Sequence, residues 1–479
     1  MEKTEFIIQY LNKKRLMQQI ILDYLDNEDD QANLLKILSY YENEKISEDK
    51  TEFLVFIKTI ACISKNHHRS SNFFTKIEQI ILKIQNDLQQ NISNMEIFNI
   101  FKNNIRILLF LIKEKIIILN EDIIKIIRNK FSVYFYPEIK KFESENISQN
   151  EIMAHNKRKN IVFGNKHSND FNCDECIIDS SVDYQKRIAE ENDDSDDELA
   201  DYQYMHFYQK SKIKESNEND DLFGHDLETF NHKRLIGEND DILCQLIRND
   251  KIDEFISYIN QNGINITSKI KLSDFETNSF LLKNHPTIIE YAAFFGSIQI
   301  FKYLIVNNCK IKSSIWLYSI HGMNPEIIHI LEEKKIKPPK NSFMECFNES
   351  IKCHHNDFTN YLCDNYISNI DEKSKDIVFL CMKMNNFLSI LYMFESKFSD
   401  FQFLNGIGFT NICLYYDYIN LAHFLIQQDE IDINKRTKII IENQKRRIKN
   451  EESVIHIALE KDNKELLKII LSNPKIDVN

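Results

Sequence analysis

Residues 453–479, the last stretch of the sequence, constrain the fold more than any other part of the chain. Apolar residues recur three or four positions apart in each half of this stretch, which predicts two short amphipathic helices in succession. Isolated helices shorter than about 12 to 15 residues are marginal in water. Such a pair must cover its apolar side with a neighbour of the same kind, so the stretch predicts that the chain contains repeats.

Copies of this pattern precede the C-terminal one. Residues 408–434 align with 453–479 without a gap. We take Ala458 as the anchor residue of the last copy, and residues followed by the same spacing of apolar positions recur further upstream. Successive anchors are 27 to 33 residues apart, except for two steps of 45 that we interpret as repeats with a loop insertion. The anchors are Ile247, Ala292, Ser319, Ser350, Leu380, Cys413 and Ala458.

The motifs inside these copies resemble those of ankyrin repeats. Residues 453–458 resemble the T-P-L-H-x-A signature, 292–296 resemble A-A-x-x-G, and 475–479 resemble the D-V-N opening of a following repeat. The stretches ENDDILCQLIRND and HPTIIEYAAFFGSIQIFKYL are similar to a family of ankyrin proteins expanded in trichomonad protists, whose N-terminal region is a helical domain of unknown function. The resemblance covers residues 240–479 and implies an all-α ankyrin-repeat solenoid of about seven helix pairs over 234–479.

The resemblance also implies a function, because ankyrin arrays bind protein partners through a concave groove. The side chains that would face this groove are Phe294, Phe295, His321, Tyr415 and Tyr416. Aromatic residues are enriched among those that dominate interface energetics. We therefore expect a protein-binding scaffold or adaptor, with a protein partner that the sequence does not identify. The alternative for these side chains is packing against the neighbouring first helix.

Residues 1–142 also have a helical pattern throughout, and we expect an N-terminal helical domain there. Asp49 and Asn120 are placed to cap helices that carry apolar residues three or four apart. Two interpretations stay open at this point. The region is either an eroded continuation of the array or a separate helical bundle.

Residues 143–233 differ from both flanking parts in charge. The chain as a whole carries a formal net charge of -13, and two runs in this segment, 190–201 and 215–228, contain eight and six acidic residues with no basic residue. Such a composition cannot bury enough apolar surface to offset the entropy cost of ordering. We expect an acidic, largely disordered linker, in which Ser195, followed by three acidic residues, is a candidate phosphorylation site.

Cys173 and Cys176 have the spacing of half a zinc site, but no second such pair follows them. We interpret them as part of the linker, and we predict no metal site. The basic insertion Lys435–Lys449 supports the alternative function, that of a nuclear or nucleic-acid-associated protein. One basic cluster in an otherwise nearly neutral region is weak support, so we expect a solvated loop and regard nucleic acid as an unlikely partner.

Signatures of enzymes are missing from the sequence. It contains no phosphate-binding glycine motif, no H-E-x-x-H and no G-x-S-x-G, and only 8 glycines in all. We therefore predict no catalytic residues and no cofactor. No run of apolar residues is long enough to cross a membrane. We expect a cytoplasmic protein without a membrane partner, with the nucleus as the alternative location.

The last repeat raises a further expectation, because its second helix is apolar on nearly all sides, with Leu466, Leu467, Ile469, Ile470 and Leu471. The end unit of a repeat array normally needs a polar outer face. We therefore expect that this edge either continues into further repeats or is covered by self-association.

Overall fold

The computed structural model describes residues 2–27, 30–70, 72–145, 227–367, 370–396, 408–437, 452–461 and 464–477. Regular structure in these ranges is helical, and the β-structure in them is limited to two isolated antiparallel bridges, Lys269 with Thr287 and Thr437 with Glu452. The prediction of an all-α chain is thus confirmed. The described residues fall into two compact units, one with 2–118 and everything from 227 onward, the other with 119–145.

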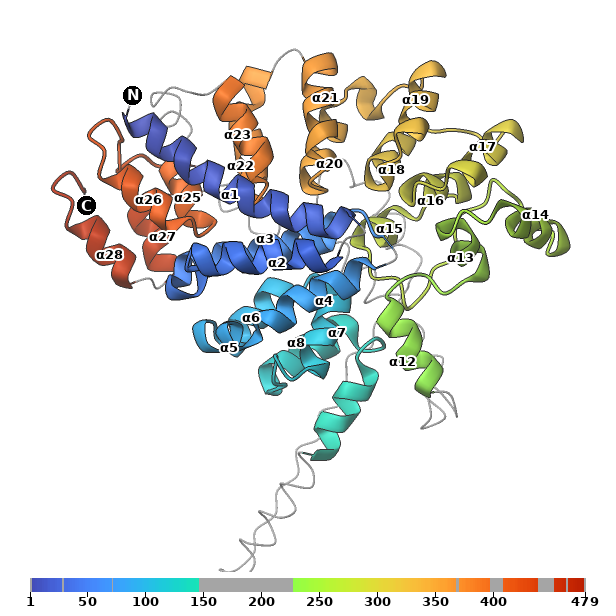
Figure 1. The fold of residues 1–479 in the computed structure, drawn as a ribbon, viewed down its shortest axis with the longest axis horizontal. Helices are drawn as coiled ribbons and strands as arrows, with labels where there is room; N and C mark the ends of the chain where they lie inside the picture. The colour runs from blue at the N-terminus through green and yellow to red at the C-terminus, as the bar shows by residue number, and fades with distance from the viewer. Residues whose placement is uncertain are drawn as a thin grey trace, which may run out of the picture. The chain divides into compact units, whose positions relative to one another are not determined.

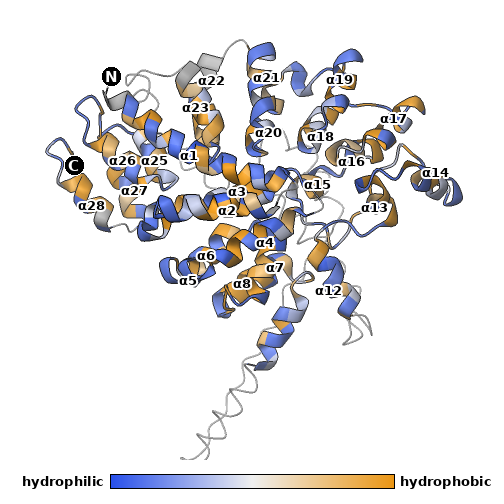
Figure 2. Ribbon diagram, viewed as in Figure 1, coloured by the Kyte–Doolittle hydropathy of each residue, from blue (hydrophilic) through white to orange (hydrophobic). Residues whose placement is uncertain are grey.

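The N-terminal part of the first unit contains seven α-helices and one short 3-10 helix within the described ranges. They are α1 (Glu2–Asp26), α2 (Asp30–Asn43), η1 (Ile46–Glu48), α3 (Lys50–Asn66), α4 (Phe73–Lys83), α5 (Gln85–Asn91), α6 (Asn94–Phe101) and α7 (Ile105–Lys113). Asp49 begins α3, and its carboxylate accepts hydrogen bonds from the backbone N–H groups of Thr51 and Glu52 as predicted. Figure 2 shows α7 apolar along almost its whole length, and all of residues 105–112 are buried.

A row of seven consecutive helix pairs forms the rest of the first unit, within the described residues. The pairs are α13 (Ile242–Arg248) with α14 (Ile252–Gln261), α16 (Ile288–Phe294) with α17 (Ile298–Val306), α18 (Ile315–Gly322) with α19 (Pro325–Glu333), α20 (Met344–Lys352) with α21 (Asn356–Tyr366), α22 (Ile370–Lys383) with α23 (Phe387–Ser396), α25 (Phe409–Tyr415) with α26 (Ile419–Ile426), and α27 (Val454–Glu460) with α28 (Lys464–Leu471). Three further elements accompany them: α12 (Leu227–Ile236), α15 (Ser279–Asn284) and η2 (Pro339–Asn341).

Neighbouring pairs pack like on like, as Figure 1 shows from the green α13 to the red α28. First helices contact first helices in the succession α16, α18, α20, α22, α25 and α27, while second helices contact second helices, for example α14 with α17 and α26 with α28. The first of the two longer steps in the sequence contains a helix, α15, where we predicted a loop. Each pair thus covers the apolar side of the next, which is the requirement that short helices impose.

The turn between the two helices of a pair has the same backbone conformation along the row. One residue in each of six turns has a positive φ, and only one of the six is a glycine. Three others are Asn or Asp, which tolerate the left-handed region, and the remaining two are Met323 and His354. The six are Asp250, Gly296, Met323, His354, Asn385 and Asp417. At Gly296 a Cβ atom would lie 2.7 Å from the carbonyl oxygen of Gly322 in the next pair, so the turn also brings two backbones close together.

The repeat register differs from the sequence-based one in two pairs, the first and the fifth. The residue after the turn donates its N–H to the anchor carbonyl, as in Ser297 to Ala292 and Tyr418 to Cys413. In the first pair Lys251, which follows the turn, donates its N–H to the carbonyl of Leu246, one residue before the predicted anchor Ile247. In the fifth pair Asn386 donates to Cys381, which is 1% exposed, whereas the predicted anchor Leu380 is only half-buried. The anchor there is Cys381.

The N-terminal helices pack along the turns of the row. Gln18 of α1 is fully buried, and its side-chain carbonyl accepts hydrogen bonds from the backbone N–H groups of Phe387, at 2.7 Å, and Leu388, at 3.1 Å. This bond caps the start of α23 from another part of the chain. Near the other end of α1 the ring of Phe6 stacks on that of Phe424 in α26, with centroids 3.9 Å apart.

The division of the chain into 1–142, 143–233 and 234–479 stays a prediction. Within the described residues, α1 to α7 belong to the same compact unit as the row, and α12 begins inside the stretch that the sequence assigns to the linker.

The second unit contains α8 (Glu121–Phe131) and a further helical stretch over 136–145. Asn120 caps α8 as predicted, since its side chain accepts a hydrogen bond from the N–H of Ile123. Arg128 and Glu143 form an ion pair of 2.7 Å between the two helical stretches. In the part of the chain that the structure describes, each helix is either too short or too polar to cross a membrane.

Candidate protein-binding cleft

Two of the five predicted groove residues are buried. Phe294 is 4% exposed and His321 is 3% exposed, and their rings stack on each other with centroids 4.8 Å apart. The ring of Phe280 in α15 also packs against His321, with centroids 4.3 Å apart. Burial leaves little of either side chain for a partner to contact. Phe294 instead packs against the neighbouring first helix, α18, which is the alternative that the sequence left open. Phe295 is half-buried and lies under the guanidinium group of Arg248.

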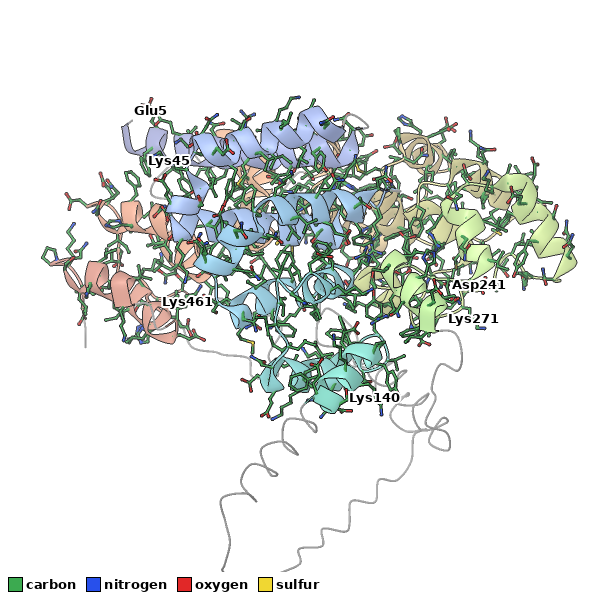
Figure 3. All side chains as sticks on the ribbon, turned by 60° about the horizontal axis from the view of Figure 1, so that its bottom comes forward. Glu5, Lys45, Lys140, Asp241, Lys271 and Lys461 are labelled. Atoms are coloured by element: carbon green, nitrogen blue, oxygen red, sulfur yellow. The ribbon has the colours of Figure 1, made fainter. Side chains whose placement is uncertain are left out.

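The other two, Tyr415 and Tyr416, are half-buried and line a cleft of about 1000 Å³. One wall of this cleft comes from α3 and α6, and the opposite wall from α22 and the turns of the last two helix pairs. Figure 3 labels Lys461 where the last helices lie beside the N-terminal ones. Two of the residues that the sequence predicted to face a groove thus lie in one wall of this cleft. The other wall belongs to residues more than 300 positions away, and no local pattern predicts it.

Basic side chains predominate in the cleft. Five lysines line it against two carboxylates, Glu96 and Asp417. Glu96 also accepts hydrogen bonds from the Ser93 hydroxyl and backbone N–H, which close a capping box at the start of α6. The lysines are Lys50, Lys58, Lys383, Lys461 and Lys464.

Asp417 connects the two walls of the cleft. Its carboxylate forms ion pairs with Lys58 of α3 and, at 2.5 Å, with Lys461 at the end of α27, and the side chains of the three are 24–28% exposed. Burial by itself would raise the pKa of Asp417, but the two ammonium groups outweigh it and hold the pKa below its ordinary value. Burial lowers the pKa of Lys461, and Asp417 only partly offsets this. The carboxylate is therefore ionised and shared between two cations.

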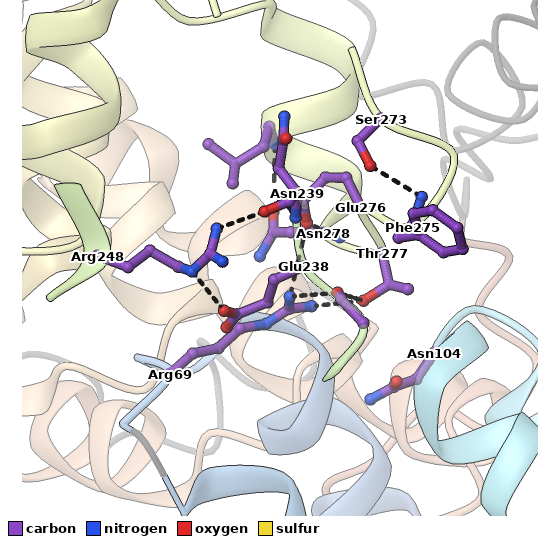
Figure 4. A network of polar contacts seen from close by, with 12 residues as sticks. Arg69, Asn104, Glu238, Asn239, Arg248, Ser273, Phe275, Glu276, Thr277 and Asn278 are labelled. Carbon is purple, nitrogen blue, oxygen red and sulfur yellow. Dashed lines mark hydrogen bonds and ion pairs between the residues drawn. The ribbon is translucent and has the colours of Figure 1, made fainter. Parts of the chain in front are cut away.

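A buried polar network joins the turn after α3 to the segments on either side of α13 and α14 (Figure 4). Arg69, in the turn after α3, donates to the carbonyl of Gly237 at 3.4 Å and lies 3.6 Å from Glu276. Burial raises the pKa of Glu276 even though Arg69 lowers it. Nearby, Arg248 pairs with Glu238 at 2.7 Å. These contacts position α3, and through it the cleft wall.

The apolar side of the last pair is largely used within the chain. Leu466 and Ile470 are fully buried, and α28 packs on α26. Leu459 and Leu471 are 60% and 54% exposed, so part of the edge stays apolar toward solvent. Self-association or continuation of the array at this edge stays a prediction.

Several predicted features lie outside the described residues. They are Ser195, the Cys173–Cys176 pair, residues 438–449 of the basic insertion, and all of the linker up to 226. The base of the insertion is described, and there Thr437 and Glu452 exchange backbone hydrogen bonds of 2.8 and 3.1 Å.

Comparison with known families finds one match. Residues 306–393 match a family model described as a domain of unknown function, DUF3447. The match begins at the end of α17 and runs from α18 into α23, the part of the chain in which the ankyrin motifs are weakest. Neither a curated protein nor a solved structure matches the chain.

Proposed function

We propose that this chain is an ankyrin-type helical-repeat scaffold of the trichomonad class that it resembles, and that it binds an acidic segment of a protein partner. The repeated left-handed turn and the like-on-like packing of helix pairs support the ankyrin-type assignment. The observation that carries the function is the cleft, because it combines five lysines with the half-buried rings of Tyr415 and Tyr416. Complementary charge steers a partner, and aromatic side chains supply contact area.

The groups in the cleft suit binding better than catalysis. Asp417 is held between two ammonium groups, and Lys461 also donates to the carbonyl of Tyr415 at 2.5 Å. A general base must be able to reach a substrate proton, which such a carboxylate does not do while it bridges both walls. We therefore propose a non-catalytic role.

The proposal is tested with a short fluorescein-labelled Glu-rich peptide and the full chain, by fluorescence anisotropy. Replacing Lys383 and Lys464 with Gln should weaken binding by about tenfold, which is about 1.4 kcal/mol, and should reduce its dependence on salt. The matched control is Lys312→Gln with Lys337→Gln, which removes two exposed lysines away from the cleft and should leave binding unchanged.

The outcomes separate the scaffold from its alternative. Equal peptide affinity in the cleft variant and the control variant would mean that the cleft is not the binding surface. Retention of a single-stranded oligonucleotide that is lost when Lys445, Arg446 and Arg447 become Gln would instead support the nuclear or nucleic-acid-associated function.

A further inference from the structure

Three potential metal ligands meet in the interior between α18 and α20. Glu349 and Cys353 are four residues apart and so lie on one face at the end of α20, while His321 comes from the last turn of α18. The Nε2 atom of His321 is 2.9 Å from a Glu349 carboxylate oxygen and 3.7 Å from the Cys353 sulfur. One ligand atom from each of the three residues lies within 4.8 Å of the others.

From this juxtaposition we propose that His321, Glu349 and Cys353 form a binding site for a zinc-type divalent metal ion. Imidazole nitrogen, carboxylate oxygen and thiolate sulfur are the ligands that zinc takes in proteins, at about 2.0 to 2.3 Å. In a tetrahedron such bond lengths separate the ligand atoms by about 3.3 to 3.8 Å. The two observed separations are within about half an ångström of this range, and the third, between Glu349 and Cys353, is at most 4.8 Å, so coordination needs the side chains to adjust.

The surroundings favour a structural ion over a catalytic one. Cys353 is fully buried and therefore cannot reach a substrate, whereas the side chain of Glu349 is 13% exposed and gives the ion a path from solvent. The rings of Phe280 and Phe294 both pack against the imidazole of His321. Three protein ligands leave one position for a water molecule on the Glu349 side.

Coordination has a defined proton balance and a structural consequence. The thiol of Cys353 releases its proton to solvent as it becomes a thiolate ligand, and His321 binds as a neutral imidazole. The ion would cross-link two neighbouring helix pairs. It would also brace the N-terminal region, because His68 donates a hydrogen bond to the backbone carbonyl of His321 at 3.0 Å and His67 donates one to that of Cys353 at 2.8 Å.

Sequence patterns predict no metal here, since the histidine is 28 positions from the glutamate and 32 from the cysteine. The three residues come together only because the C-terminal ends of α18 and α20, the first helices of two neighbouring pairs, are adjacent in space.

Cobalt(II) titration of the full chain, stripped with a chelator and kept anaerobic, tests the proposal. Cobalt bound to a thiolate absorbs in the near ultraviolet by sulfur-to-metal charge transfer, and we expect this band to saturate at one equivalent and to disappear when zinc is added. Zinc should also raise the thermal midpoint of the stripped protein. Cys353→Ser should abolish the band, and Glu349→Gln, which keeps the side-chain volume, should weaken cobalt binding at least tenfold.

Two control variants locate the ion. Cys346→Ser changes another fully buried cysteine of α20 and should keep the band. The double variant Cys173→Ser, Cys176→Ser should also keep it. A band that survives Cys353→Ser and is lost in the double variant would place the metal at those two cysteines and overturn the proposal, as would failure to bind one equivalent. If Cys353→Ser loses its helical circular dichroism, Glu349→Gln decides, and unchanged cobalt affinity in that variant refutes the site.

Discussion

The bridge from Asp417 to Lys58 and Lys461 joins the two walls of the cleft, and replacing Asp417 with Asn tests how much it stabilises the chain. Asn is the suitable substitute because Asp417 has a φ of 66°, and Asn is among the few residues that adopt this left-handed conformation readily. The substitution removes the charge, keeps the shape and leaves the turn intact. Two ammonium groups then share a partly buried space without a counter-charge.

The expected loss follows from how far the three groups are buried. Breaking a fully buried ion pair costs about 3 to 5 kcal/mol, whereas exposed pairs contribute about 0 to 1 kcal/mol. The side chains of Lys58, Asp417 and Lys461 are 27%, 28% and 24% exposed, between these limits. We therefore expect Asp417→Asn to lower the free energy of unfolding by about 2 kcal/mol at neutral pH.

Urea unfolding followed by circular dichroism measures this loss in two backgrounds. In the wild-type background Asp417→Asn should destabilise the protein. In a background with Lys58→Met and Lys461→Met the carboxylate has lost both cations, so the same substitution should be neutral or stabilising. The same loss in both backgrounds would refute the electrostatic account and point to the turn itself.

The pH dependence gives an independent check. The folded-state pKa of Asp417 lies below its ordinary value of 3.8, so the folded protein holds this proton less tightly than the unfolded chain. The contribution is then fully present above pH 3.8 and is lost as the pH falls through the lowered pKa. The difference between wild type and Asp417→Asn should shrink over that range.

Three further changes have definite expectations. Gln18→Ala should cost about 2 kcal/mol and speed limited proteolysis between α1 and α2, because it leaves the N–H groups of Phe387 and Leu388 buried without their acceptor; unchanged proteolysis would mean that α1 docks by other contacts. Gly322→Ala should destabilise by more than about 3 kcal/mol, since its Cβ would overlap the carbonyl oxygen of Ala293. Its control is Gly263→Ala, where nothing lies within 4 Å and only the positive φ opposes the change, so a loss of about 1 kcal/mol is expected in urea unfolding.

Sequence patterns were sufficient where the physics is local. The caps at Asp49 and Asn120 are where the sequence predicts them, because a helix start depends on a few adjacent residues. The anchor at Cys381 was missed by one position, because Leu380 and Cys381 are both apolar and apolar spacing alone does not choose between them. The sequence left open whether Phe294 faces a groove or packs against the next first helix, since its burial depends on His321 of the next pair and on α15.

The sequence by itself determined that this chain is built from short helices that need neighbours of their own kind, because three- and four-residue apolar spacing is a property of the local chain. It also determined that acidic charge is concentrated in 190–228. Only the tertiary structure decided where function can reside. The cleft joins Lys58 to Asp417, and the proposed metal site joins His321 to Cys353. Such juxtapositions depend on how repeats stack and on where α1 to α7 dock, and stacking is governed by shape and burial summed over the whole unit.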